Sequence, residues 1–171
     1  MAKLSAGLLL FRRMHDQIEV FLVHPGGPFW ARKDEGAWSL PKGEFTEDED
    51  PLQAAKREFT EETGLEAEGA FLPLGESKQP SGKSVTAWAL ERDLDASTIK
   101  SNMFSMEWPP KSGKIQEFPE VDRGGWFSLP QARAKILKGQ VTFIERLSEK
   151  LGVTIPEEAG EPSPSAQASL F

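Results

Sequence analysis

The sequence predicts a single α/β domain, and three features of the chain indicate this fold class. Two apolar runs near the N-terminus, residues 4–11 and 18–23, have the length and composition of buried strands. Residues 51–63 carry apolar side chains at helical spacing on one side and polar side chains on the other. Two further strand-like runs, residues 66–74 and 84–91, follow this helix. Strands that alternate with helices in this way are typical of α/β proteins.

Turns and loops rich in Gly, Pro and polar residues connect these elements. A polar turn near residues 14–17 predicts a hairpin between the first two strands. Residues 24–28 are expected to form a loop, and residues 38–40 a short strand that leads toward the helix. A turn around residues 80–82 joins the next two strands. Residues 93–114 show no clear period, and we expect a long loop there.

The C-terminal third is expected to add a strand and two helices. Residues 125–128 have the character of a strand end, and Pro130 opens a helix that continues to about Leu137. Residues 140–151 form a second amphipathic pattern.

A change in composition marks the end of the domain. From Thr154 the chain is rich in Pro, Glu, Ser, Ala and Gly and has few apolar residues, so it cannot bury enough surface to offset its ordering entropy. We therefore expect a domain over residues 1–153 and a flexible tail over residues 154–171.

Both ends of the helix expected at residues 51–63 carry ordinary helix signals. Asp50 followed by Pro51 supplies an N-cap carboxylate and a proline at the first helical position. Gly64 is expected to end the helix, as glycine commonly does just beyond the last turn. The apolar stripe that anchors the helix consists of Leu52, Ala55 and Phe59.

The opposite side of this helix gathers three carboxylates, Glu58, Glu61 and Glu62. Residues three and four apart share a helix face, so these charges repel one another unless a cation lies between them. Hard divalent cations such as Mg²⁺ take oxygen ligands and commonly bridge carboxylates to phosphate oxygens. A solvated acidic helix face is the alternative, but it leaves the ordered flanking sequence without a role. We therefore interpret the cluster as a metal site.

The segment from Gly43 to Leu65 resembles the Nudix box, whose pattern is G-x5-E-x7-R-E-U-x-E-E-x-G-U, where U is a bulky apolar residue. Every fixed position of this pattern is met, and the preceding Leu40-Pro41-Lys42 resembles the usual approach to the box. The matching residues are Gly43, Glu49, Arg57, Glu58, Phe59, Glu61, Glu62, Gly64 and Leu65.

This resemblance implies both a fold and a chemistry. The fold is an α/β/α sandwich with a mixed sheet, in which the box forms the loop and helix that hold metal. The chemistry is hydrolysis of a pyrophosphate bond in a nucleoside diphosphate linked to another group, with Mg²⁺ or Mn²⁺ as the cofactor. A bound ion of this kind neutralises phosphate charge and activates water.

The same resemblance implies roles for the residues of the box. Glu58, Glu61 and Glu62, together with the backbone carbonyl of Gly43, are expected to ligate the metal. Arg57 and Glu49 are expected to orient the helix and its ligands, although an ordinary ion pair would produce the same pattern.

The general base is expected outside the box, on a carboxylate in a late loop. Glu120 lies six residues before Trp126, in a placement that resembles the late catalytic glutamate of related hydrolases. Glu117 is the second choice, and the box glutamates Glu61 and Glu62 are the remaining option. A solvated loop carboxylate is the alternative interpretation of both late residues.

Several residues outside the box are candidates for substrate contact. Lys42 and Arg12 could bind phosphate, although a plain surface charge is the alternative for Arg12. Trp30 and Trp38 flank the approach to the box and could stack a nucleobase, with core packing as the alternative. His24 could act in the site or be a structural histidine. One wall of the pocket is expected from Phe104, Trp108 and Phe118.

Substrate identity is the part that the sequence determines least. The run from Trp38 to Glu44 resembles dinucleoside polyphosphate hydrolases, so diadenosine tetraphosphate ranks first, although those enzymes usually carry a tyrosine that this chain lacks. Pro80, fifteen residues beyond Leu65, resembles ADP-ribose pyrophosphatases. A nucleoside triphosphate pyrophosphohydrolase ranks third. A regulatory domain that binds a nucleotide without catalysis would be expected to lose box glutamates, and none is missing here.

Composition narrows the classes of partner and site. The chain has 171 residues, no cysteine and two histidines, which excludes disulfides and thiolate metal sites and disfavours a His-based zinc site. A net charge of −7 argues against general nucleic-acid binding but permits a nucleotide partner, because bound metal inverts the local field. With no apolar run of transmembrane length and no signal-like start, a cytoplasmic enzyme without membrane contact is expected. The sequence does not determine the oligomeric state.

Overall fold

A computed structural model describes residues 3–79, 81–156 and 167–168. The sheet strands among them are β1 (Leu4–Met14), β2 (Gln17–Pro25), β3 (Lys42–Phe45), β4 (Phe71–Lys78), β5 (Ser84–Glu91), β8 (Val121–Ser128) and β9 (Gln167–Ala168). They form one mixed sheet in the order β4-β5-β1-β2-β8-β9, with β3 also paired to β1. Only β1 and β5 run parallel; the other pairs are antiparallel.

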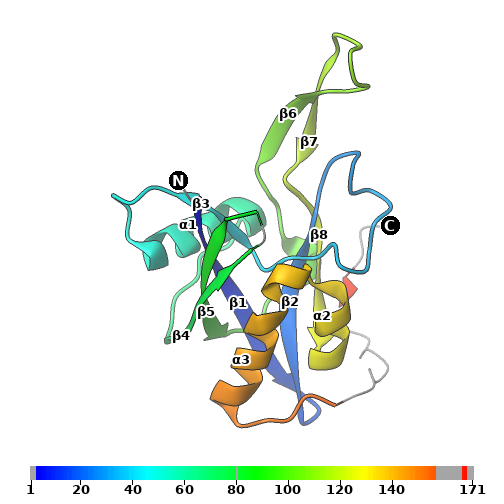
Figure 1. Cartoon of the computed structure of the whole chain (residues 1–171). Helices are drawn as coiled ribbons and strands as arrows, with labels where there is room; N and C mark the ends of the chain where they lie inside the picture. The colour runs from blue at the N-terminus through cyan, green and yellow to red at the C-terminus, as the bar shows by residue number, and fades with distance from the viewer. Residues whose placement is uncertain (1–2, 80, 157–166, 169–171) are drawn as a thin grey trace.

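Helices cover both faces of this sheet, as Figure 1 shows. Helix α1 (Pro51–Thr63) packs on one face, where Ala54, Ala55 and Phe59 meet alternate residues of β1. Helices α2 (Leu129–Lys135) and α3 (Val141–Leu151) pack on the other face. The expected α/β/α sandwich with a mixed sheet is therefore confirmed. No helix in the described ranges is long and apolar enough to cross a membrane.

The central feature of the sheet is a separation between β1 and β2. These strands pair only near their shared turn, from Phe11 to Met14 on β1. Toward the other end the chain from Ser39 to Phe45 inserts between them: Ser39 bridges Val23 of β2, and β3 pairs with Leu4 to Gly7 of β1. A Cβ at Gly7 would lie 2.2 Å from a methyl carbon of Leu40, so this insertion requires glycine there. The separation of β1 and β2 thus places the start of the box, β3, beside β1 at the end of the sheet remote from the β1–β2 turn.

The local signals at the hairpin and at helix α1 are confirmed. The β1–β2 turn consists of His15 and Asp16, both with positive φ, as a two-residue turn between twisted strands requires. Asp50 accepts a hydrogen bond from the backbone N–H of Gln53 at 3.0 Å. Gly64 has φ 78° and donates to the carbonyl of Thr60 at 2.7 Å.

Three strand expectations are corrected by the structure. Residues 93–114 are not a long loop: strands β6 (Met103–Glu107) and β7 (Ile115–Pro119) form a separate two-stranded hairpin that extends away from the sheet in Figure 1. Each strand is only five residues long, so its alternation was too short to register as a period. The strand expected at residues 38–40 consists of isolated bridges, and β4 begins at Phe71, beyond the positive φ of Gly69.

Parts of the expected tail contact the domain. Ile155 packs against the core on the side of α2 and α3, and Gln167–Ala168 pair with Gly125 and Gly124 of β8. Residues 157–166 and 169–171 lie outside the described residues. The domain boundary at residue 153 and the flexibility of the tail stay predictions.

Arg12 is not a phosphate-binding residue or a plain surface charge. It lies at the end of β1 remote from β3, with 7% of its surface exposed. Its guanidinium pairs with Glu19 and with Asp93, each at 2.8 Å, and stacks over the ring of Trp126 at 4.3 Å. Because Glu19 is itself only 3% exposed, Arg12 neutralises a buried carboxylate.

We predict that Arg12→Leu lowers the free energy of unfolding by about 3 kcal/mol, because it leaves the buried Glu19 without its guanidinium. The neighbouring Arg13 is the control: its pair with Glu91 at 3.4 Å is more than half exposed, so Arg13→Leu should cost less than about 1 kcal/mol. Urea denaturation measures both, and activity at a temperature where both remain folded should be unchanged. Equal destabilisation by the two substitutions would contradict this role of Arg12.

Candidate active site

Arg57 organises the carboxylates of helix α1. Its guanidinium forms two parallel hydrogen bonds with Glu49, both at 2.9 Å, and donates to Glu58 at 2.8 Å and to Glu61 at 3.4 Å. The bidentate contact fixes the plane of the guanidinium. The guanidinium therefore connects Glu49, in the loop before the helix, to two of the three glutamates of α1, Glu58 and Glu61. These contacts fit both interpretations of Arg57 and Glu49, as orienting residues and as an ordinary ion pair, and the orienting role stays a prediction.

Gly43 makes room for the Glu58 carboxylate. Glu58 is 9% exposed and faces β3, where a Cβ on Gly43 would lie 2.0 Å from its carboxyl carbon. No side chain can occupy that position while Glu58 stays in place. The glycine of the box is therefore required by a contact with its own glutamate, and Glu58 is held against the Gly43 backbone.

The electrostatics show an excess of negative charge around Glu62. Burial, followed by the charge of Glu58, raises the pKa of Glu62 to about 8, while Lys42 opposes this shift. Burial and the charge of Glu61 raise the pKa of Glu58 as well. In turn, burial lowers the pKa of Lys42, although Glu62 opposes the change. Arg57 and Lys42 together do not neutralise the cluster.

The donor set fits a hard divalent cation. In this conformation no three His, Cys, Asp or Glu side chains of the described residues converge to hold a metal ion, and Arg57 is the partner of Glu58 and Glu61. The set nevertheless consists of oxygen donors only, which suits Mg²⁺ or Mn²⁺. A cation placed there would relieve the repulsion that raises the pKa values of Glu58 and Glu62.

A pocket of about 190 Å³ opens beside the carboxylates and contains three of the residues expected outside the metal-ligand set. Glu62 comes from α1, Lys42 from β3, and Trp30 from the 26–36 loop, while Glu120 is the residue before β8. The backbone of Glu120 is fixed by its N–H to the carbonyl of Asn102 and by its carbonyl to the N–H of Gly26, both at 2.9 Å. Partial burial and the charge of Glu61 raise the pKa of Glu120. The full lining is Val23, Pro25, Trp30, Ala37, Ser39, Lys42, Glu62, Glu120, Val121 and Leu137.

Two expected residues lie elsewhere. Trp38 is 4% exposed and packs edge-on against Phe127 in the core beneath α2 and α3, so it cannot stack a nucleobase. Glu117 is exposed on β7, opposite Ser105, and does not line the pocket. Glu117 lies within β7, whereas Glu120 lies between the end of β7 at Pro119 and the start of β8 at Val121.

The β6–β7 hairpin and the 26–36 loop form an aromatic contact that sequence patterns did not reveal. Phe29 and Trp108 pack edge to face with ring centroids 5.3 Å apart, and Phe29 remains 60% exposed. At the base of this contact a Cβ on Gly27 would lie 2.9 Å from the ring of Phe104. Trp108 and Phe104 were expected in a pocket wall, but neither lines the pocket beside Glu62. Phe29 was not among the expected residues, and its place beside Trp30 in a Gly-Pro loop was the available signal.

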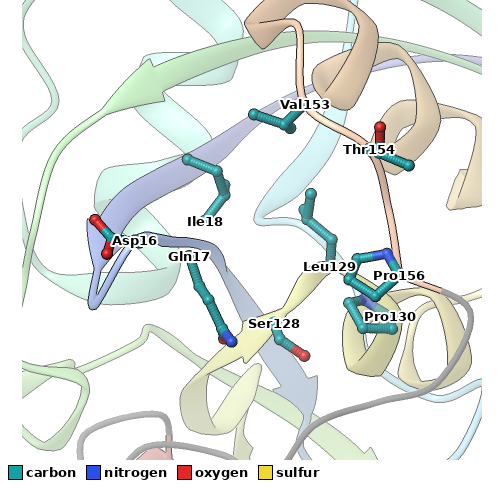
Figure 2. A pocket seen from close by; sticks show the side chains of 9 residues that line it. All are labelled: Asp16, Gln17, Ile18, Ser128, Leu129, Pro130, Val153, Thr154 and Pro156. Carbon is teal, nitrogen blue, oxygen red and sulfur yellow. The ribbon is translucent and has the colours of Figure 1, made fainter.

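A second pocket, of about 150 Å³, lies at the opposite end of the β1–β2 pair (Figure 2). It is formed by the hairpin turn, the start of α2 and the chain beyond α3. Of the nine residues that line it, only Asp16 is charged. It offers neither a carboxylate cluster nor a cation for phosphate, so we assign the chemistry to the pocket beside Glu62.

Comparison with known proteins agrees with this geometry. The family model of the NUDIX domain matches residues 1–147. The chain belongs to the Nudix family. Among curated proteins, it is 37% identical over 60 residues to the RNA pyrophosphohydrolase of Hahella chejuensis, a match that covers 34% of this chain and only 37% of that protein's length.

Solved Nudix structures share the fold. The chain is similar to a C. elegans Ap4A hydrolase in a binary complex, with 23% identity, a TM-score of 0.57, and coverage of 88% of this chain and 98% of the other. It is also similar to the NUDIX domain of Shewanella oneidensis NrtR complexed with ADP ribose, with 19% identity, a TM-score of 0.59, and coverage of 88% and 89%. The proteins to which the chain is similar include hydrolases, and Nudix enzymes generally use divalent metals such as Mg²⁺.

We predict that Gly43→Ala lowers activity by about 100-fold and raises the Mg²⁺ concentration required, because the new Cβ displaces Glu58. The control is Gly139→Ala, whose Cβ meets only the flexible side chain of Gln79, at 3.0 Å. A Mg²⁺ titration of both variants measures the effect. Wild-type rate and Mg²⁺ dependence in Gly43→Ala would show that this contact does not position the site.

Proposed function

We propose that this Nudix protein hydrolyses a pyrophosphate bond in a dinucleoside polyphosphate, such as diadenosine tetraphosphate, with Mg²⁺ as its cofactor. The observation that carries the proposal is the presence of two aromatic surfaces on the 26–36 loop, one of which lines the acidic pocket. Trp30 lines the pocket that contains Glu62 and Glu120, and the Phe29–Trp108 pair lies outside that pocket. A substrate with a nucleobase at each end could use both surfaces.

The metal role is assigned to the box. Glu58, Glu61 and Glu62 with the carbonyl of Gly43 would hold the ion, and the chemistry that Mg²⁺ supplies when bound is neutralisation of phosphate charge and activation of water. Arg57 keeps Glu58 and Glu61 oriented through its paired contact with Glu49.

The remaining residues act on the substrate and on water. Lys42, beside Glu62 in the pocket, offers an ammonium group to phosphate oxygens. Glu120 lines the same pocket and can accept the proton of the attacking water. Its raised pKa is consistent with a base that is poised closer to neutral pH than a solvated glutamate.

Three other substrate classes are outcomes of the test. ADP ribose is the ligand in the similar NrtR structure, and RNA is the substrate named for the Hahella relative. Nucleoside triphosphates are the third. Pro80, the sequence feature that favoured ADP-ribose, lies outside the described residues. Loss of catalysis altogether is disfavoured because every glutamate of the box is present.

The test is a substrate panel of diadenosine tetraphosphate, ADP-ribose, ATP and 5′-triphosphorylated RNA with Mg²⁺. We expect the highest kcat/KM with diadenosine tetraphosphate. Phe29→Ala should then raise its KM about tenfold by removing a stacking surface, and should leave the KM for ATP unchanged.

The control for Phe29→Ala is Ile115→Ala. This substitution removes a 68% exposed apolar side chain from the β6–β7 hairpin, against which Phe29 packs. A higher kcat/KM for any other member of the panel would replace the proposed substrate. Failure to cleave every member would favour the regulatory alternative.

The proposed base is tested by Glu120→Gln, which should lower kcat by about 100-fold and leave KM within a few-fold. Adding Mg²⁺ should not restore the rate, because Glu120 is not assigned as a ligand. Glu117→Gln, at the exposed position on β7, is the matched control and should keep normal kinetics. If Glu117→Gln is the impaired variant, the base is misassigned; if neither is impaired, a box glutamate is the base.

A further inference from the structure

His24, on strand β2, contacts an oxygen atom with each of its ring nitrogens. Its ring is fully buried, with 0% of its surface exposed. Nδ1 lies 2.9 Å from a carboxylate oxygen of Asp122, and Nε2 lies 2.6 Å from the backbone carbonyl oxygen of Lys33. These are the contacts of a residue held from two sides.

Both partners of His24 are hydrogen-bond acceptors. An ionised carboxylate and a backbone carbonyl have no proton to donate, so each contact needs a proton on the imidazole nitrogen. At 2.6 Å, an unprotonated Nε2 would direct its lone pair at the lone pairs of the carbonyl oxygen. A flipped ring would place carbon atoms against both oxygens. The geometry therefore needs a proton on each ring nitrogen.

The other charged groups near His24 already have partners. Trp38 packs edge-on against the imidazole at 5.2 Å, and its Nε1 donates to Asp34, which also pairs with Lys135. The guanidinium of Arg123 lies over the indole ring of Trp38, 5.3 Å from its centroid. Asp122 is thus the charge in direct contact with the imidazole.

The two partners belong to segments that matter for the site. Asp122 lies on β8, two residues beyond Glu120. Lys33 closes the turn that begins at Trp30: its N–H donates to the Trp30 carbonyl at 3.0 Å, and its ammonium lies 5.1 Å from the Trp30 ring. His24 therefore connects the strand that follows the proposed base to the turn that carries the pocket tryptophan.

We propose that His24 is a doubly protonated positioning residue. It holds the turn that carries Trp30 against strand β8 and thereby sets the affinity for the substrate base. The inference rests on the proposed function in one respect, which is that Trp30 contacts a nucleobase. The protonation state and the order of the turn can be measured without any substrate, so these parts of the inference can be tested separately.

The protonation state is tested by ¹⁵N NMR of the full chain labelled at histidine. The chain has two histidines, and the exposed His15 in the β1–β2 turn is the internal reference. We expect a proton on each ring nitrogen of His24, because both of its oxygen partners are acceptors. A neutral tautomer at His24 would overturn the proposal.

The positioning role is tested with His24→Gln and Asp122→Asn, with His15→Gln as the control. His24→Gln cannot donate to both oxygens, so we expect faster amide hydrogen exchange in residues 30–36 and a KM about tenfold higher, with kcat within a few-fold. Asp122→Asn can still accept a hydrogen bond from Nδ1, so its KM should rise less than that of His24→Gln.

The readouts separate the possible failures. A fall in kcat without a change in KM would place His24 in the chemical step and overturn the positioning role. Faster exchange with an unchanged KM for every cleaved substrate would overturn the link between the turn and base binding. If the panel selects a substrate other than diadenosine tetraphosphate but the NMR, exchange and KM changes occur as expected, the inference stands and only the proposed substrate fails.

Discussion

The site depends on keeping several carboxylates close together in a place that water reaches poorly. Glu58 is pressed against the backbone of Gly43, and Glu62 lies beside it in the pocket wall. Burial raises the pKa of both groups, Glu61 adds to the shift of Glu58 and Glu58 to that of Glu62, while Arg57 opposes the first shift and Lys42 the second. A folded protein sustains such repulsion when the rest of the fold holds the groups in place. Here the apolar side of α1, buried through Ala54, Ala55 and Phe59, provides that support.

The same constraint explains the opened sheet. Glu58 can approach Gly43 only because β3 lies alongside β1, and β3 reaches that position because β2 has separated from β1 beyond Phe11. Gly7 is the residue that permits the insertion, since any side chain there would collide with Leu40. Two glycines far apart in the sequence therefore make room for the same site. Gly7 leaves space for the chain that leads into β3, and Gly43 leaves space for the Glu58 carboxylate.

The aromatic residues that contact the nucleobases in our proposal come from two segments that pack on one another, the 26–36 loop and the β6–β7 hairpin. The 26–36 loop leans on the β6–β7 hairpin through Phe29 and Trp108, and it is tied to the sheet through His24. A two-stranded hairpin has little stability of its own in water. We infer that loop and hairpin stabilise each other, so the position of Trp30 in the pocket depends on the hairpin as well as on the loop.

The sequence by itself determined the parts of this protein whose signals are local. The caps at Asp50 and Gly64, the spacing of Glu58, Glu61 and Glu62, and the turn at His15 and Asp16 depend on neighbours within a few residues, and all occur as expected. Only the tertiary structure decided which distant residues share a space. It buried Trp38 and Arg12, brought Glu120 rather than Glu117 to the pocket, and placed Trp108 against Phe29. Burial and pairing across the sheet arise from contacts between residues far apart in the chain, and no local period encodes them.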